Sequence, residues 1–438
     1  MPAPETIARI RALQILDSRG RPTLEVEVES ASGARSSAMI PSGASTGRHE
    51  AHELRDGPSG GYGGLSVLVA AGNVNGEINR ELRGWSVQDQ GALDRRLIEL
   101  DGTENKARLG ANAVLGVSMA AARSAAALAN EPLWRSLAGG RPAAVPVPMI
   151  NILSGGLHAG GQLEFQDFLV VPHGFETFAE ALEAAVRIHG ATEGQLRAEG
   201  HALTGVADEG GLGPRLASNR EAIETLIRGI EAAGYRPGAQ VSIALDVAAS
   251  HFHRNGDYEL SSEGRTLAEA EMIELLAEWA RAYPIVSIED GLGEDAWAGW
   301  SGLNNRIGDA CKLVGDDLFC TNPTRLERGI QEQAANAVLV KMNQIGTLTE
   351  TLQVVDRARE AGFAAVISAR SGETEDSFLA DLATASGSGQ IKVGSITRSE
   401  RLSKYNRLLK IEAEMEQAGG PAGFQASRSY LRSLGYAT

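Results

Sequence analysis

Short apolar runs that carry a polar residue at or near their end recur along the second half of the chain, and they constrain the fold most. The runs are VSIALD, YPIVSIED, KLVGDD, NAVLVKMN, AAVISAR and QIKVG, each followed by helix-like sequence. Successive ends are roughly 20–45 residues apart, about one strand–helix unit each. Repeated units of this length over residues 138–438 predict a closed α/β barrel, whose active-site face is formed by the strand carboxyl ends. The polar residues there are Asp246, Glu289, Asp316, Lys341, Arg370 and Lys392.

A doubly wound open sheet has the same periodicity and is the alternative fold. The stretches GYGG and GGLGP do not combine with a strand and a helix in the order that a dinucleotide-binding fingerprint requires. We therefore interpret them as turns and prefer the closed barrel.

The segment before the barrel has a different texture. TLEVEVES and ARSSAMI are strand-like, and LEVEVE alternates apolar and acidic residues with the period of two that leaves one strand face in water. Helix-like sequence follows from about residue 91 to 130, so residues 1–137 are predicted to form a smaller α+β domain that caps the barrel of residues 138–438. LAGGRPAAVPVP concentrates glycine and proline and is the expected hinge.

Charge and cysteine content limit the partners and the compartment. The net charge of −15 disfavours binding to nucleic acid or to an anionic membrane. Cys311 and Cys320 lack metal-ligand spacing and are expected to be reduced thiols. The N-terminal stretch lacks the apolar core of a signal peptide, and GVSMAAARSAAALAN, interrupted by Arg123, is too short for a membrane span and is expected to be a packed helix. We therefore expect a soluble, cytoplasmic protein.

Three of the strand-end residues are carboxylates: Asp246, Glu289 and Asp316. Converging in a barrel mouth, they would raise one another's pKa unless a cation lay between them. Ligation by oxygen alone, without His or Cys, suits Mg²⁺ (or Mn²⁺) rather than Zn²⁺. The alternative is that the carboxylates are caps paired with neighbouring strands.

Lys341 and Lys392 follow at later strand ends, opposite the acids in a closed barrel. A lysine near a divalent cation and a second lysine loses part of its preference for the ammonium form, so it can act as a base near pH 7. The alternative is that both lysines only pair with the carboxylates. Glu209, in VADEGGLGP, would face Lys341 as an acid, although alone it would equally be a turn carboxylate. Together these groups suit proton removal beside a carboxylate and acid-assisted loss of a leaving group.

Longer motifs resemble the enolase family from about residue 11 to residue 412. They are QILDSRGRPTLEVEV, PSGASTGRHEAHELRDG, GANAVLGVSMAAA, PVPMINILSGGLHAG, DEGGLGP, ALDVAAS, YPIVSIEDGLGEDAW, LVGDDLFCTNPTRL, KMNQIGTLTET, SGETEDSFLADLA and GQIKVGS with RSERLSKYNRLL. The resemblance implies an α/β fold: an enolase-type irregular (β/α)8 barrel with a smaller N-terminal α+β domain. It also implies a homo-oligomer, dimer or octamer, that acts on a small anionic phosphoryl substrate.

The resemblance further implies two Mg²⁺ ions in each active site. Asp246, Glu289 and Asp316 would hold the first. Ser45, in the SGAST loop, would help to bind the second, which arrives with the substrate.

The family's reaction converts 2-phosphoglycerate into phosphoenolpyruvate, and the resemblance implies a role for each remaining residue. Lys341 would take the C2 proton, and Glu209 would serve the departing C3 hydroxyl, with Asp167 on the same side. The substrate would be bound by Lys392 at its carboxylate, by Arg370 and Ser371 at its phosphate, and by His158 and Gln166 from GGLHAGG and QDF.

Three positions depart from the family pattern. Ala369 stands where the family turn HRSGETED has histidine, Asp167 where QEF has glutamate, and Ser154 where NGG has asparagine. The aspartate is shorter by one C–C bond, roughly 1.5 Å, and the missing imidazole leaves room for a larger ligand. Single polar groups in such sites contribute about 2–4 kcal/mol to the transition state, so the chain is expected to be a divergent member.

Three functions follow from these departures. The first is the ordinary enolase reaction with Mg²⁺. The second is a specialised paralogue on a related phosphonate or phosphoryl ligand, of the carboxyphosphonoenolpyruvate synthase type in phosphonate natural-product biosynthesis. The third is a non-catalytic binding protein, which the retained acids and lysines disfavour.

Overall fold

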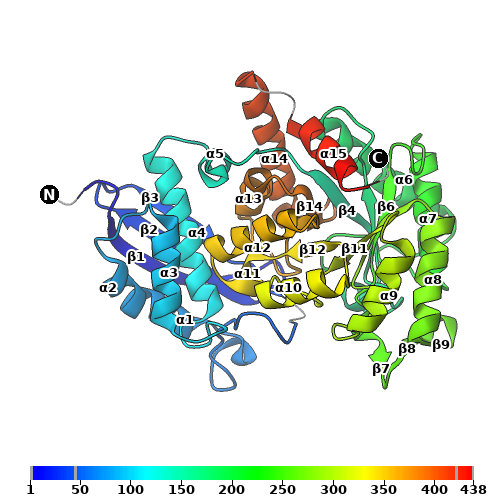
Figure 1. Cartoon of the computed structure of the whole chain (residues 1–438), viewed down its shortest axis with the longest axis horizontal. Coiled ribbons are helices and arrows are strands. Elements are labelled where there is room, and N and C mark those ends of the chain that lie inside the picture. The colour runs from blue at the N-terminus through cyan, green and yellow to red at the C-terminus, as the bar shows by residue number, and fades with distance from the viewer. Residues whose placement is uncertain (1–2, 44–46, 420–422, 437–438) are drawn as a thin grey trace.

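The computed structural model describes residues 3–43, 47–419 and 423–436. The N-terminal part contains an antiparallel sheet in the order β1-β2-β3, with helices packed beside it (Figure 1). Its strands are β1 (Ile7–Leu16), β2 (Pro22–Ser30) and β3 (Arg35–Met39), and its helices are α1 (Leu68–Asn73), α2 (Asn79–Leu82), α3 (Gln90–Asp101), α4 (Ala111–Leu128) and α5 (Leu133–Ala138). This is the α+β arrangement predicted for the segment.

Helix α4 packs directly on the sheet. Val26 and Val28 of β2 are fully buried, whereas Glu25 and Glu27, which alternate with them, stay partly exposed, as the period of two predicts. An added Cβ at Gly116 of α4 would lie only 2.4 Å from Cγ2 of Val26. Glycine there lets the helix backbone approach the strand.

By length and composition alone, α4 could cross a membrane, because its 18 residues have a mean hydropathy of 1.2. The run GVSMAAARSAAALAN lies mostly within this longer helix, and 78% of the helix is buried inside the protein, as expected of a packed helix. Arg123, which interrupts the apolar stretch, forms a 2.6 Å ion pair with Asp376, just before helix α13 (Phe378–Ser386). Helix α4 is thus a packed core helix that also connects the N-terminal part to the barrel.

The rest of the chain closes into a barrel in the order β10-β11-β12-β13-β14-β4-β5-β6, so the open-sheet alternative is wrong. Strand β5 is antiparallel to both neighbours, and the other pairs are parallel. Two strands and two helices therefore precede the regular alternation, which is the predicted irregular start. The strands are β4 (Val147–Ser154), β5 (Asp167–Val171), β6 (Ser242–Asp246), β10 (Ile285–Glu289), β11 (Lys312–Gly315), β12 (Ala337–Val340), β13 (Ala364–Ser368) and β14 (Gly389–Gly394).

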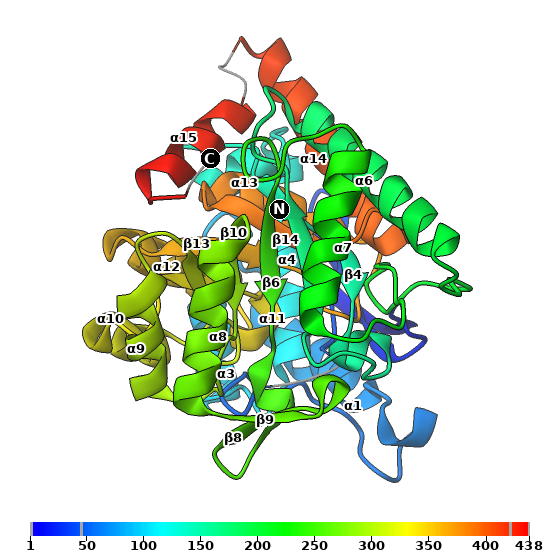
Figure 2. The same ribbon diagram turned by 90° about the vertical axis from the view of Figure 1, so that its right-hand side faces the viewer.

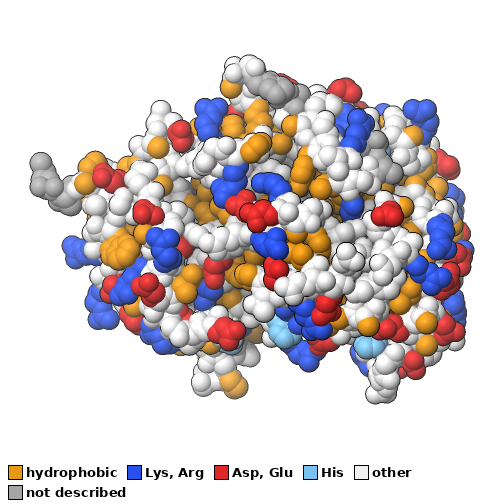
Figure 3. All heavy atoms as spheres, in the orientation of Figure 1, with side chains coloured by type: hydrophobic (Ala, Val, Ile, Leu, Met, Phe, Trp, Pro, Cys, Tyr) orange, Lys and Arg blue, Asp and Glu red, His pale blue; other side chains and the backbone are white. Residues whose placement is uncertain are grey.

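Helices surround the barrel, and a small sheet projects from it at β8 and β9 (Figure 2). The small sheet comprises β7 (His253–Arg254), β8 (Asp257–Leu260) and β9 (Arg265–Ala268). The helices are α6 (Phe178–Ala198), α7 (Asn219–Ala232), α8 (Glu269–Ala282), α9 (Trp297–Ile307), α10 (Pro323–Glu332), α11 (Met342–Ile345), α12 (Leu348–Glu360), α13 (Phe378–Ser386), α14 (Ser399–Gln417) and α15 (Gly423–Ser433). On the face drawn in Figure 3, acidic and basic side chains are interspersed rather than segregated.

The strand carboxyl ends bring the candidate residues to one rim of the barrel. Asp246 and Glu289 are the last residues of β6 and β10 and are partners in the parallel register. Asp316 and Lys341 directly follow β11 and β12. Lys392 of β14 pairs in the parallel register with Ser368, the last residue of β13. Arg370 follows Ser368 by two residues and therefore lies at the same rim.

Candidate active site

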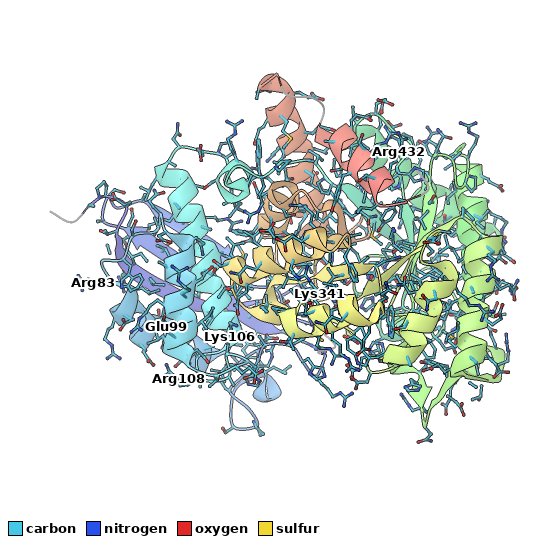
Figure 4. All side chains as sticks on the ribbon, in the orientation of Figure 1. Arg83, Glu99, Lys106, Arg108, Lys341 and Arg432 are labelled. Atoms are coloured by element: carbon cyan, nitrogen blue, oxygen red, sulfur yellow. The ribbon has the colours of Figure 1, made fainter. Side chains whose placement is uncertain are left out.

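The strand ends enclose a small cavity near the middle of the molecule, where Figure 4 labels Lys341. Most of the predicted catalytic and substrate-binding residues line it. The lining residues are His158, Gln166, Glu209, Asp246, Asp316, Lys341, Ser368, Ala369, Arg370, Ser371, Lys392 and Val393. Asp167 and Glu289 lie behind this lining, and Ser45 falls outside the described residues.

Lys392 connects two of the predicted metal ligands. Its Nζ donates hydrogen bonds to Oδ2 of Asp246 at 2.7 Å and to Oε2 of Glu289 at 2.6 Å. The other oxygens, Oδ1 of Asp246 and Oε1 of Glu289, accept no hydrogen bond from a described residue. Both carboxylates therefore pair with a lysine, as the alternative interpretation expected, and each keeps an oxygen that suits a hard cation.

The two acids differ in their protonation equilibria. Burial and the charge of Asp246 raise the pKa of Glu289 well above its usual range. Burial also acts to raise the pKa of Asp246, but the Lys392 charge outweighs it, so this pKa is lowered. The positive charge of Lys392 is therefore not enough to compensate the negative charge of ionised Glu289. A divalent cation would stabilise both anions, which is the behaviour expected of a Mg²⁺ site.

Lys341 pairs with the third acid, through Nζ and Oδ2 of Asp316. Burial alone would lower the pKa of Lys341, but the Asp316 charge raises it above its usual value. This is opposite to the shift that a base needs. The predicted base role therefore requires that the charge of Asp316 be neutralised by something else.

A second group of carboxylates adjoins the first, and the sequence interpretation missed it. Oxygens of Asp290, Asp316 and Asp317 lie within 4.8 Å of one another. Asp290 accepts hydrogen bonds from the backbone N–H groups of Asp316 at 2.9 Å and Asp317 at 2.8 Å. Burial and the Asp316 charge raise the pKa of Asp317 to about 7. The acidic doublets in SIED and VGDD were the available signal.

His158 lies between two acids at the other side of the cavity. Its Nδ1 is 2.9 Å from Oδ2 of Asp167, and its Nε2 is 4.0 Å from Oε1 of Glu209. Burial alone would lower the pKa of His158, but the charges of Asp167 and Glu209 raise it to about 9. The imidazole is therefore protonated at neutral pH.

Asp167 contacts His158 on the side away from the cavity. It is fully buried, and its Oδ1 accepts hydrogen bonds from Ser154 Oγ at 2.9 Å and from Nδ2 of Asn151. Asn151 Nδ2 also donates to Ser154 Oγ at 2.8 Å. The shorter acid and the serine, two departures from the family pattern, thus belong to one hydrogen-bond network.

Arg370 is held by an acid that the sequence interpretation also missed. Its Nη1 donates to Glu50 Oε2 at 2.9 Å and to Asn343 Oδ1 at 3.0 Å. Nε2 of Gln344 donates hydrogen bonds both to Glu50 Oε1 at 3.4 Å and to Asp316 Oδ1 at 2.9 Å. Glu50 is thereby connected to one of the predicted metal ligands. Contacts between residues so far apart in sequence have no local signal.

The comparisons agree with this geometry. The family model "Enolase, N-terminal domain" matches residues 7–137, and "Enolase, C-terminal TIM barrel domain" matches residues 142–430. An enolase from Rubrobacter xylanophilus is 52% identical over 426 residues, which cover 97% of this chain and 99% of that protein. The fold and the site thus define a lyase of the enolase superfamily. The chain belongs to the enolase family.

Proposed function

We propose that this protein is a Mg²⁺-dependent enolase that converts 2-phosphoglycerate into phosphoenolpyruvate. The observation that carries the proposal is that Lys341, Glu209, Lys392 and Arg370 line one cavity beside oxygen-only carboxylates. An assay of phosphoenolpyruvate absorbance with 2-phosphoglycerate tests it: turnover with Mg²⁺, and none with excess EDTA, is expected. Absence of turnover with Mg²⁺ would reject it.

The metal-binding role falls to Asp246, Glu289 and Asp316, with Ser45 at a second ion. Bound Mg²⁺ would supply positive charge that stabilises the dianion formed on proton loss. The free oxygens on Asp246 and Glu289 support this assignment. It is testable by calorimetric titration of the protein with Mg²⁺ alone.

The chain's own groups divide the remaining work. Lys341, relieved of the Asp316 charge, takes the C2 proton, and Lys392 orients the substrate carboxylate. Arg370 and Ser371 bind the phosphate as a planar fork and a hydroxyl, and Gln166 supports Asp246 through a 3.2 Å hydrogen bond.

Glu209 serves the departing C3 hydroxyl. The His158 charge, together with those of Arg401 and the lysines, outweighs burial and lowers the pKa of Glu209. Glu209 therefore rests as an anion, and the imidazolium of His158 is the neighbour that can supply a proton. Asp167 is assigned as a positioning residue that keeps His158 charged, rather than as a group that touches the substrate.

A specialised paralogue on a larger phosphoryl ligand is the second candidate, because Ala369 lines the cavity. Ala369→His fills that space. If the ordinary reaction is limited by the missing imidazole, the variant should raise kcat for 2-phosphoglycerate several-fold. A wild-type rate already typical of enzymes, roughly 10 s⁻¹ or more, with no gain in the variant would reject the paralogue.

The assembly we propose is a cytoplasmic homo-oligomer, with the chain divided into domains at residues 137 and 138. Leu13 and Leu16 on β1, and Leu68 and Val69 on α1, are 51–63% exposed. Gln14 of β1 accepts hydrogen bonds from Ser66 and Val67, which directly precede α1. These contacts bring β1 and the start of α1 together, so their exposed apolar side chains lie on neighbouring segments of the surface, where apolar groups often mark interfaces.

A further inference from the structure

Arg401, in the first turn of α14, is one of the largest fully buried side chains of the described chain. Its guanidinium donates hydrogen bonds to backbone carbonyl groups. Nη1 donates to the carbonyl oxygens of Arg370 at 2.7 Å and Val393 at 2.9 Å, and Nη2 donates to that of Ser371 at 2.6 Å. The three carbonyls belong to the turn after β13 and to the residue after Lys392. Arg401 therefore contacts, from behind, the backbone that carries the anion-binding side chains of the cavity.

Lys404, one helical turn later, holds the other end of the same turn. Its Nζ donates to the Thr374 carbonyl at 2.6 Å and pairs with Glu373 Oε2 at 2.9 Å. The other oxygen of Glu373 accepts the backbone N–H of Arg370 at 3.1 Å. We call Arg401 and Lys404 the carbonyl clamp. The segment from Arg370 to Thr374 is thus fixed at both ends by one helix.

The neighbouring strand leaves room for this arrangement. An added Cβ at Gly394 would lie 3.0 Å from Cδ of Arg401 and 2.9 Å from the Glu209 carbonyl oxygen. Gly394 also has a φ of +119°, a conformation that side chains rarely adopt. Glycine at this position therefore allows the buried arginine to reach the strand ends.

We propose that Arg401 is a positioning residue for the phosphate-binding turn: it turns the carbonyls of Arg370 and Ser371 away from the cavity, so that their side chains and a buried positive charge face the ligand's phosphate. This inference rests on the proposed function in that the turn's ligand is a phosphate.

Electrostatics gives the reason why binding depends on such a contact. A carbonyl oxygen that turned toward the cavity would repel an anionic ligand, whereas one bonded to Arg401 is both satisfied and directed away. A buried cation also acts at short range without solvent screening. A lysine keeps the charge but not the planar fork that reaches several carbonyls at once. Arg401→Lys should therefore retain the fold, but the carbonyl groups of the turn should no longer be held in the same orientation.

Tyr405 offers a matched control on the same helix. It is fully buried and donates to the carbonyl of Gly394 at 2.8 Å, so it holds the adjacent strand but not the phosphate-binding turn. Tyr405→Phe removes one hydrogen bond of the same kind. A general loosening of α14 would affect binding in both variants, whereas the proposed role affects only Arg401→Lys.

The experiment compares wild type, Arg401→Lys and Tyr405→Phe by calorimetric titration with inorganic phosphate and by steady-state kinetics on 2-phosphoglycerate, both with Mg²⁺. We expect Arg401→Lys to raise Kd for phosphate and KM at least 10-fold with a smaller change in kcat, and Tyr405→Phe to change each less than twofold. Values within twofold of wild type in folded Arg401→Lys, or equal effects in both variants, would overturn the inference.

Three less favourable cases still decide the inference. If Arg401→Lys does not fold, Lys404→Gln replaces it, with the same direction and at least a threefold effect expected; an unchanged Kd overturns the clamp. If wild type binds phosphate but does not dehydrate 2-phosphoglycerate, the proposed function fails and the phosphate titration alone decides the role of Arg401. Wild type that neither binds phosphate nor turns over 2-phosphoglycerate overturns both; if it turns over 2-phosphoglycerate without binding free phosphate, the KM of Arg401→Lys decides the role of Arg401.

Discussion

Asp167 holds His158 with one carboxylate oxygen and accepts hydrogen bonds from Ser154 and Asn151 with the other. Sequence reasoning singled out Asp167, His158 and Ser154 but neither Asn151 nor the connection between them, because hydrogen-bond partners across two strand ends depend on the three-dimensional register. It likewise predicted the strand-end acids and lysines, whose positions follow from strand periodicity alone. Glu50 and Gln344 could not be predicted, since their partners are remote in sequence.

Asp167→Asn tests the electrostatic part of this network. The variant removes the charge that most strongly raises the pKa of His158, so that the opposing effect of burial gains weight and the pKa should fall clearly below about 9. The imidazolium is then lost at lower pH, and the basic limb of the kcat/KM profile should move down with it. NMR titration of the His158 ring measures the shift directly.

Ser154→Ala is the control, because it removes a hydrogen bond and leaves the Asp167 charge. We expect a shift smaller than half a unit. A His158 pKa that stays near 9 in Asp167→Asn would show that Glu209 and Asp246 maintain the imidazolium, and would remove Asp167 from the proposed positioning role.

At the scale of elements, most of the parallel barrel strands carry a candidate site residue at or near the carboxyl end, whereas the antiparallel β5 carries Asp167 as its first residue. His173, just after β5, is fully buried, and its Nε2 lies 2.9 Å from Oγ of Ser242 on β6. Burial and the charges of Arg428 and Arg432 lower its pKa to about 4. Sequence reasoning missed this histidine, because no local pattern marks a histidine that packs in its neutral form between elements.

His173 should make the barrel sensitive to acid. Its folded pKa is below the unfolded value, so the unfolded state binds more protons between these values and stability is lost as pH falls from about 6.5 toward 4. From pH 7 to pH 5 this amounts to about 2 kcal/mol. Urea unfolding of His173→Gln at both pH values should show a loss smaller by that amount, whereas exposed His52→Gln should behave as wild type. Equal losses in all three proteins would contradict the assignment.

At the scale of the whole molecule, the closed barrel, its irregular start and the α+β part were predictable, because periodicity and motif resemblance extend over nearly the whole chain. The properties of the surface were less predictable. Composition gives the net charge, but it does not show where exposed apolar side chains lie together. Those on β1 and α1 lie far apart in sequence, and the contacts that bring the two elements together, including those of Gln14, are not visible in composition.

Leu13→Asp combined with Leu68→Asp tests the proposed oligomer. Charges on this patch should dissociate the assembly, and light scattering coupled to gel filtration should show a fall in mass toward 46.1 kDa. Val186→Asp, at a site on α6 that is 50% exposed, is the matched control and should leave the mass unchanged. An unchanged mass in the double variant would show that the interface does not lie on this patch.

The most direct measurement is exchange of the C2 proton of 2-phosphoglycerate with D₂O, followed beside phosphoenolpyruvate formation in wild type, Lys341→Ala and Glu209→Gln. If Lys341 is the base and Glu209 serves the leaving group, wild type performs both steps with Mg²⁺, Lys341→Ala loses both by at least 10³-fold, and Glu209→Gln keeps exchange while losing dehydration at least 10²-fold. Exchange that survives in Lys341→Ala, or its absence in wild type, would contradict the proposed chemistry.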